Sequence, residues 1–157
     1  MELNDITAVI IDAAMKVHSR LGPGLLESAY ESCLKHELQQ RRLFVASQVT
    51  VPIVYDGVMI DAGFRADLMV EGKVIVELKA VEKMNPLYEA QLLTYLKLSG
   101  LKVGLLINLN VLHLKDGIKR GNRGVNWKGG YRIWRVLPAS KGFHFFNSPS
   151  THSLFCR

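Results

Sequence analysis

The chain has 157 residues, of which 48% are hydrophobic and 22% are charged, and its formal net charge is +6. This length and composition predict one folded domain and exclude an extended disordered chain. No apolar run approaches the roughly 18 residues of a membrane span, and the first residues (MELNDI) are unlike a signal peptide. Cys33 and Cys156 are too few for a disulfide framework or a zinc site. We therefore expect a cytoplasmic protein with reduced thiols and no membrane association.

The positive charge is concentrated at the C-terminal end of the chain. Residues 1–116 contain 12 Lys/Arg and 14 Asp/Glu, whereas residues 117–157 contain 8 Lys/Arg and no acid. A basic surface favours nucleic-acid binding, but the count alone places none on the first part. A basic surface on residues 1–116 would require clustering of its Lys and Arg side chains. The candidates are Arg65, Lys73, Lys79, Lys83 and Lys97.

Two helices are predicted in the first 40 residues. Apolar residues recur at three- and four-residue steps from Leu3 to Leu21, and Asn4 or Asp5 can cap the start of this helix. The segment Gly22-Pro23-Gly24 ends it. A second helix is predicted from about Leu25 to Gln40, with one apolar stripe.

Strands and a third helix follow. Val49 to Tyr55 alternates between apolar and polar residues and leads into Asp56-Gly57, a strong hairpin turn signal, after which Val58 begins the returning strand. A further hairpin is predicted from Phe64 to Ala80. Beyond it lie a helix from Asn85-Pro86 to about Leu98, an apolar strand from Val103 to Leu109, and a short strand from Leu112 to Leu114. This order predicts the α/β (mixed α+β) class, with a central mixed sheet flanked by helices.

The character of the sequence changes near residue 120. Residues 121–157 combine glycines, scattered aromatic residues and basic residues without periodicity. We therefore predict a folded domain over residues 1–120 and a basic, poorly ordered extension over residues 121–157. The alternatives are a basic–aromatic arm that binds nucleic acid and a gene end read out of its original frame. The aromatic residues lack a regular spacing, which favours the extension or the frame change over the arm.

Asp67, Glu77 and Lys79 interrupt the apolar hairpin RADLMVEGKVIVELKA. Glu77 and Lys79 are two residues apart on a strand and share one face. A two-residue turn would set Asp67 opposite Val76, on the other face. A three-residue turn or a bulge would set Asp67 opposite Glu77, close enough for both carboxylates to share a cation. The alternative is a solvated face with an ordinary Glu/Lys pair, but charges within a buried apolar run favour a site.

An Asp, a hairpin turn and Glu-X-Lys resemble the PD-(D/E)XK nuclease superfamily. The run Gly24-Leu-Leu-Glu27-Ser-Ala-Tyr30 resembles the signature of the GxxExxY family, a bacterial branch of that superfamily. The resemblance extends over about Leu3 to Arg120, and Ala66 stands where the superfamily name has proline. It implies a restriction-endonuclease-like core for this chain.

The resemblance also implies a metal-dependent nuclease with Mg²⁺ or Mn²⁺. Asp67, Glu77 and the backbone carbonyl of Leu78 would be the metal ligands, since hard cations prefer oxygen ligands. Lys79 would orient or help deprotonate the attacking water and neutralise developing charge. Glu27 would complete the metal site, directly or through water. By its position alone, Glu27 in a first helical turn would complement the helix dipole.

Four residues are candidates for substrate binding. Gln91 and Tyr95 are neighbours on the third helix, and their spacing resembles the Gln-x-x-x-Tyr pair of an exonuclease branch, where it lies beside metal and DNA backbone. Arg65 would contact phosphate or pair with Asp67. Tyr30 would contact phosphate or pack in the core.

The leading prediction is therefore a nuclease that acts on nucleic acid, DNA rather than RNA. The alternative is a catalytically inactive nuclease-fold module that binds nucleic acid or protein, or serves as a subunit of a defence or repair complex. An intact set of Asp67, Glu77 and Lys79 favours the enzyme. The sequence leaves open exonuclease or endonuclease action, sequence specificity and oligomeric state.

Overall fold

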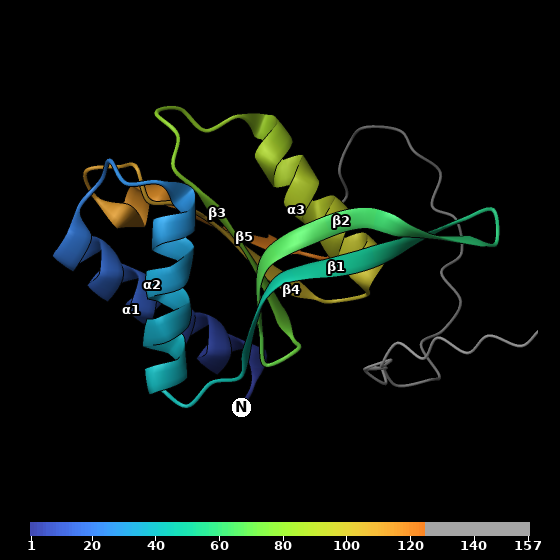
Figure 1. Ribbon diagram of the computed structural model, residues 1–157, viewed down its shortest axis with the longest axis horizontal. Coiled ribbons are helices and arrows are strands. Elements are labelled where there is room, and N and C mark those ends of the chain that lie inside the picture. The colour runs from blue at the N-terminus through green and yellow to red at the C-terminus, as the bar shows by residue number, and fades with distance from the viewer. Residues whose placement is uncertain (125–157) are drawn as a thin grey trace, which may run out of the picture. The chain divides into compact units, whose positions relative to one another are not determined.

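The computed structural model describes residues 1–124, which form a five-stranded mixed sheet flanked by helices (Figure 1). Its elements are α1 (Leu3–Leu21), α2 (Glu27–Gln40), β1 (Val45–Tyr55), β2 (Val58–Val70), β3 (Val74–Lys79), α3 (Pro86–Ser99), β4 (Val103–Asn108), the 3-10 turn η1 (Leu114–Gly117) and β5 (Ile118–Asn122). Strand order in the sheet equals chain order. Among the strands of residues 1–124, only the β3–β4 pair is parallel, and α3 supplies the crossover that a parallel pair requires. The predicted fold class is confirmed.

Helices cover both faces of the sheet (Figure 1). On one face, α1 and α2 pack against Val74, Val76 and Leu78 of β3, all fully buried. On the other face, Leu92 and Leu96 of α3 pack with other apolar residues in a smaller cluster. Successive residues of a strand point to opposite faces, so β3 contributes to both layers. Within residues 1–124, no helix has the length and apolar character needed to span a bilayer.

The end of the folded part differs from the prediction in two respects. The predicted strand from Leu112 to Leu114 is wrong, because Leu114 begins η1 and buries its side chain there, and the last strand is β5. Strand β5 also runs past the predicted domain end at residue 120, since Gly121 pairs with Gly104 in β4. Of the predicted extension, residues 125–157 lie outside the described residues.

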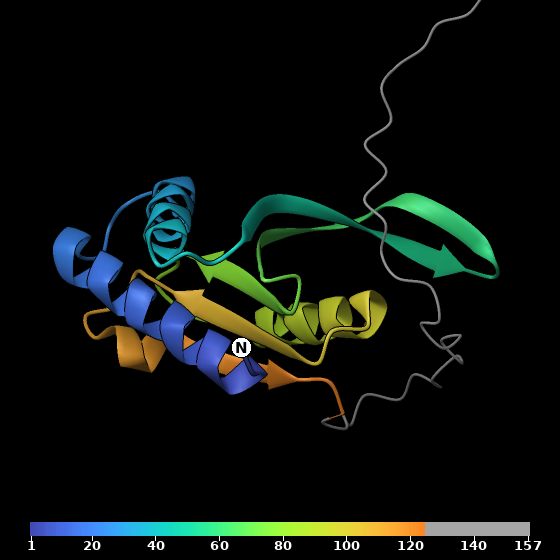
Figure 2. The same cartoon turned by 90° about the horizontal axis from the view of Figure 1, so that it is seen from below.

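Strands β1 and β2 form a hairpin whose outer part projects from the sheet (Figures 1 and 2). Its tip is the predicted two-residue turn, in which Asp56 and Gly57 have φ of 48° and 79°. A register shift between Val51 and Ile53 separates this outer part, and a Cβ on Gly63 would overlap the Val51 carbonyl oxygen and the Ile53 side chain. Glycine therefore allows the two strands to approach closely where the hairpin leaves the sheet.

Candidate active site

The β2–β3 turn determines which face Asp67 occupies. Leu68 pairs with Val76, so the turn consists of three residues, 71–73, two of which have the left-handed φ that such a turn uses. Continuing this register by one residue sets Asp67 across from Glu77. Of the two registers that the sequence allowed, the structure adopts the one that brings the two acids together.

Asp67 is tied to the neighbouring strand by its side chain. Its Oδ2 accepts a hydrogen bond of 2.8 Å from the backbone N–H of Leu78, beyond the last regular backbone pair between β2 and β3. The other oxygen makes no hydrogen bond within residues 1–124. The carboxylate is thus held beside the backbone of Leu78 with one oxygen left for another partner.

Glu77 is buried without full hydrogen bonding. Its side chain is 3% exposed, and Oε1 has no hydrogen-bond partner within the described part of the chain. Burial, and next the neighbouring Asp67 carboxylate, raise the pKa of Glu77 from its ordinary value of 4.5 to about 7, against the opposing effect of Lys79. A buried carboxylate with an unsatisfied oxygen is unfavourable unless a cation compensates it.

Lys79 provides part of that compensation. Its ammonium nitrogen donates to the Leu78 carbonyl oxygen at 2.9 Å and lies 3.4 Å from Glu77 Oε2. The same nitrogen lies 5.5 Å from the centre of the Tyr88 ring, which comes from the first turn of α3. The ammonium therefore contacts two of the oxygens that the sequence predicted as metal ligands.

Glu27 joins the site from a different element, as the first residue of α2. Burial raises its pKa, Lys79 lowers it, Asp67 raises it, and a hydrogen bond from the Ala80 backbone lowers it. Glu27 is therefore close enough to feel the charges of the β2–β3 hairpin. Within residues 1–124, however, no three side chains of His, Cys, Asp or Glu are grouped closely enough to hold a metal ion. The predicted role of Glu27 at the metal, directly or through water, stays a prediction.

The predicted pair on α3 lies beside the carboxylates. Gln91 Nε2 donates to the Tyr95 hydroxyl, and the Tyr95 ring stacks on Phe64 with centroids 3.7 Å apart. Burial raises the pKa of Tyr95, the Gln91 hydrogen bond lowers it, and the charge of Glu77 raises it. Phe64, which sequence reasoning missed as a site residue, holds the Tyr95 ring by stacking. Its only signal was an aromatic residue three positions before Asp67.

The predicted contact between Tyr30 and phosphate is not supported, because the side chain is fully buried. Its hydroxyl donates to the Gly22 carbonyl at 2.6 Å and accepts from the Leu25 N–H at 3.1 Å. The alternative of a core residue holds. Tyr30 fixes the loop that leads into Glu27, and so acts on the site only indirectly.

The ion pair between Arg65 and Asp67 is not present, and Arg65 is exposed. The strict alternation along β2 also fails at Asp67, since Ala66 packs on the α3 side and Leu68 on the α1–α2 side. The two-residue spacing therefore does not establish that Arg65 shares a face with Asp67. Its contact with phosphate stays a prediction.

The basic residues of the first part do not gather at one place. Lys73 lies in the β2–β3 turn and Lys79 at the other end of β3, so their backbones are about 20 Å apart at the usual rise of a strand. Lys97 lies near the end of α3, and Lys83 in the loop that precedes this helix. The candidate basic surface is therefore divided between opposite ends of the sheet.

Asn108 was missed by sequence reasoning. It is 1% exposed, and its Oδ1 accepts from the N–H groups of Val81 at 3.1 Å and Asn110 at 3.2 Å, while Nδ2 donates to the Val81 carbonyl at 2.9 Å. In the parallel ladder Asn108 pairs with Lys79. It therefore fixes the chain just after the Glu-X-Lys strand. A single polar residue near the end of the apolar run VGLLINL was the available signal.

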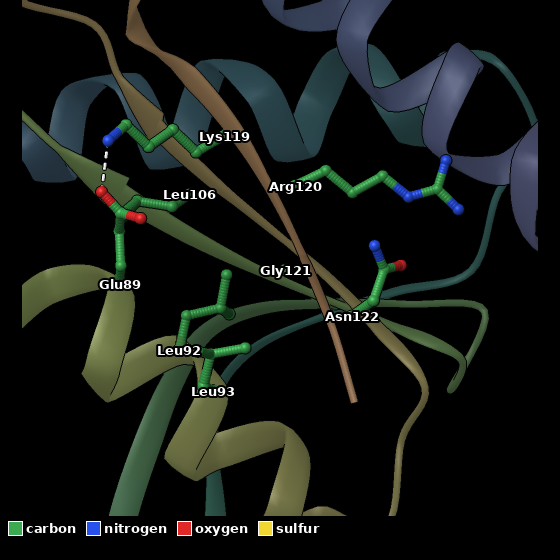
Figure 3. A pocket seen from close by; sticks show the side chains of 8 residues that line it. All are labelled: Glu89, Leu92, Leu93, Leu106, Lys119, Arg120, Gly121 and Asn122. Carbon is green, nitrogen blue, oxygen red and sulfur yellow. Dashed lines mark hydrogen bonds and ion pairs between the residues drawn. The ribbon is translucent and has the colours of Figure 1, made fainter. Parts of the chain in front are cut away.

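A separate pocket of about 150 Å³ lies between α3 and β5 (Figure 3). The residues that line it are Glu89, Leu92, Leu93, Leu106, Lys119, Arg120, Gly121 and Asn122. Glu89 and Lys119 form an ion pair across its rim. None of these residues belongs to the predicted site, so we assign the pocket no part in the chemistry.

Comparison with known protein families agrees with this geometry. The model of the PD-(D/E)XK nuclease superfamily matches residues 4–121, which include Asp67, Glu77 and Lys79. The chain belongs to the PD-(D/E)XK nuclease superfamily. No curated protein and no solved structure is significantly similar to the chain. Membership implies a nuclease fold with nucleic acid as its partner, while the GxxExxY branch stays a prediction.

Proposed function

We propose that this protein is a cytoplasmic nuclease that uses a divalent metal ion to hydrolyse phosphodiester bonds in DNA. The observation that supports this best is the buried Glu77 carboxylate, which faces Asp67 and keeps Oε1 without a hydrogen-bond partner in the described residues. Such an arrangement costs stability in a protein that does not use it. In a superfamily of nucleases, a metal ion is the partner that this oxygen lacks.

The donor set fits a hard cation. Asp67, Glu77 and the Leu78 carbonyl would hold Mg²⁺ or Mn²⁺, which prefer carboxylate and carbonyl oxygens. Glu27 would hold a water molecule of the metal. When bound, the metal would supply positive charge to the phosphoryl oxygens and acidify a bound water.

The remaining residues have roles that follow from their positions. Lys79 would orient the attacking water and stabilise the negative charge that develops on the phosphate. Tyr95 and Gln91, which lie beside the carboxylates, would donate hydrogen bonds to the substrate backbone. Arg65 is exposed and would bind a phosphate of the same strand.

A second candidate is an inactive nuclease-fold module that binds nucleic acid or acts as a subunit of a defence or repair complex. The distribution of charge favours it. Residues 1–116 hold more acids than bases, and the basic side chains lie at opposite ends of the sheet. Strong binding of a nucleic-acid backbone normally needs several clustered Lys and Arg side chains.

The deciding experiment measures cleavage of plasmid, linear duplex, single-stranded DNA and RNA with Mg²⁺ and with Mn²⁺. We expect Asp67→Asn and Glu77→Gln to abolish both cleavage and the stabilisation that the metal gives to the wild type. Lys79→Ala should bind metal and lose turnover by at least about 100-fold. Glu82→Gln removes an exposed acid of the adjacent loop and is the matched control, with cleavage unchanged.

The inactive module would replace the enzyme if the wild type binds no divalent ion in calorimetry and cleaves none of these substrates. DNA as the substrate would be wrong if only RNA is cleaved.

A further inference from the structure

The position of Lys79 conflicts with the metal site proposed above. Its ammonium nitrogen lies 2.9 Å from the Leu78 carbonyl oxygen and 3.4 Å from Glu77 Oε2. Both oxygens belong to the proposed ligand set. A divalent cation bound to them would meet a second positive charge at contact distance, where repulsion is strong. The ammonium group and the metal therefore cannot occupy these contacts together.

The ring of Tyr88 offers Lys79 a favourable alternative position. Its side chain is 13% exposed, so full release of the ammonium into solvent would require the side chain to leave its packing. The Tyr88 ring centre is 5.5 Å away, within the range in which a ring face attracts an ammonium group. Movement toward this ring would separate Lys79 from the two oxygens while keeping its charge beside the site.

Tyr88 is itself held in place by the start of α3. Asn85 caps the helix through its side chain, which accepts from the Leu87 N–H at 2.9 Å, and its carbonyl accepts from the Tyr88 N–H at 3.0 Å. The Tyr88 side chain also packs against the apolar cluster on the α3 side. The ring is therefore held in place beside the Lys79 ammonium group.

We propose that the Lys79 ammonium takes the place of the metal ion in the metal-free protein, and that Tyr88 is the positioning residue that receives this ammonium when the metal binds. This inference rests on the proposed function, because it requires Glu77 and Leu78 to be metal ligands. It assigns Lys79 two roles in sequence. The ammonium first compensates the buried Glu77, and after displacement it lies beside the bound metal, available to water and phosphate.

Metal affinity of the full chain, measured by calorimetry with Mn²⁺, tests the first half. Lys79→Met keeps the length of the side chain and removes the competing charge, so Mn²⁺ should bind on the order of tenfold more tightly than to the wild type. Lys83→Met is the matched control. It removes an exposed lysine from the following loop, which contacts neither ligand oxygen, and the affinity should remain within about twofold.

Tyr88 variants test the second half in a double-mutant cycle. Tyr88→Phe keeps the ring face and should bind Mn²⁺ like the wild type. Tyr88→Leu removes the ring face and should weaken binding about two- to fivefold, the usual worth of an ammonium–ring contact. In the Lys79→Met background the same Tyr88→Leu change should have no effect on Mn²⁺ affinity, because no ammonium remains to be received.

Each outcome bears on the proposal. Tighter binding by Lys79→Met together with coupling between Lys79 and Tyr88 supports it. Wild type that binds Mn²⁺ while Lys79→Met binds no more tightly overturns it and leaves the nuclease proposal intact. An equal effect of Tyr88→Leu in both backgrounds overturns the role of Tyr88. Absence of binding by every variant overturns the metal site itself and this inference with it.

Discussion

The two faces of strand β3 differ in whether their side chains stabilise the fold. On the α1–α2 face, Val74, Val76 and Leu78 are fully buried in the larger core cluster. On the α3 face, Ile75 is packed in the same way, but Glu77 and Lys79 follow it. The strand thus stabilises the fold on one side and places a buried carboxylate, which opposes stability, on the other.

The helix layers on the two faces of the sheet also differ in how many apolar residues they bury. Among the described residues, the cluster on the α1–α2 side contains 19 buried residues and the cluster on the α3 side contains 6. The smaller α3 layer includes Tyr95, and the carboxylates of Asp67 and Glu77 lie beside it. The buried carboxylate on the α3 face is therefore tolerated because the α1–α2 face provides most of the apolar burial that stabilises the fold.

The largest effect should come from the stabilising face. Leu78→Ala removes a fully buried side chain and should lower the free energy of unfolding by about 3 kcal/mol. The backbone carbonyl, which is the proposed ligand, stays in place, so the Mn²⁺ affinity of the folded protein should hardly change. Urea unfolding and calorimetry measure the two quantities. A large loss of affinity in a folded variant would show that the two faces are not independent.

The second prediction concerns pH and the opposite face. The pKa of Glu77 is raised from 4.5 to about 7 in the folded protein, so the native state binds more protons than the unfolded state in this range. Stability of the metal-free wild type should therefore fall as pH rises from about 4.5 to about 7, by up to about 3 kcal/mol. The side chain introduced by Glu77→Gln does not titrate. The free energy of unfolding of this variant should therefore depend less on pH across this window than that of the wild type.

Urea unfolding at several pH values measures this difference, with and without Mn²⁺. Metal should restore stability to the wild type above neutral pH and leave Glu77→Gln unaffected, because the ion binds the charged carboxylate. Parallel pH profiles for the two proteins would contradict the assignment of the raised pKa to Glu77.

The sequence was sufficient for most of the fold. Apolar periodicity predicted α1 and α2, and the Asn85-Pro86 start signal predicted α3. The Asp56-Gly57 signal located the tight turn of the first hairpin. Periodicity failed between Leu112 and Leu114, where apolar and polar residues alternate as in a strand. Three residues are too short for periodicity to distinguish a strand from the 3-10 turn η1 that forms there.

The site was predictable only in part, because its geometry depends on contacts distant in sequence. Residue spacing placed Glu77 and Lys79 on one face, but the position of Asp67 depended on the number of residues in a turn. The role of Tyr30 depended on burial by other elements, and Phe64 and Asn108 act through partners about thirty residues away. Local sequence patterns do not contain these pairings.

The smallest effect is expected at the far edge of the sheet. Truncation after Gly124 keeps every pair of β5, including Asn122 with Val103, and removes five basic residues. If residues 125–157 are the predicted poorly ordered extension, the free energy of unfolding should change by less than about 0.5 kcal/mol. Truncation after Arg120 instead removes the Gly121 and Asn122 pairs and should destabilise the protein. Urea unfolding of both truncated proteins separates these effects. Loss of the fold in the protein that ends at Gly124 would show that the extension belongs to the domain.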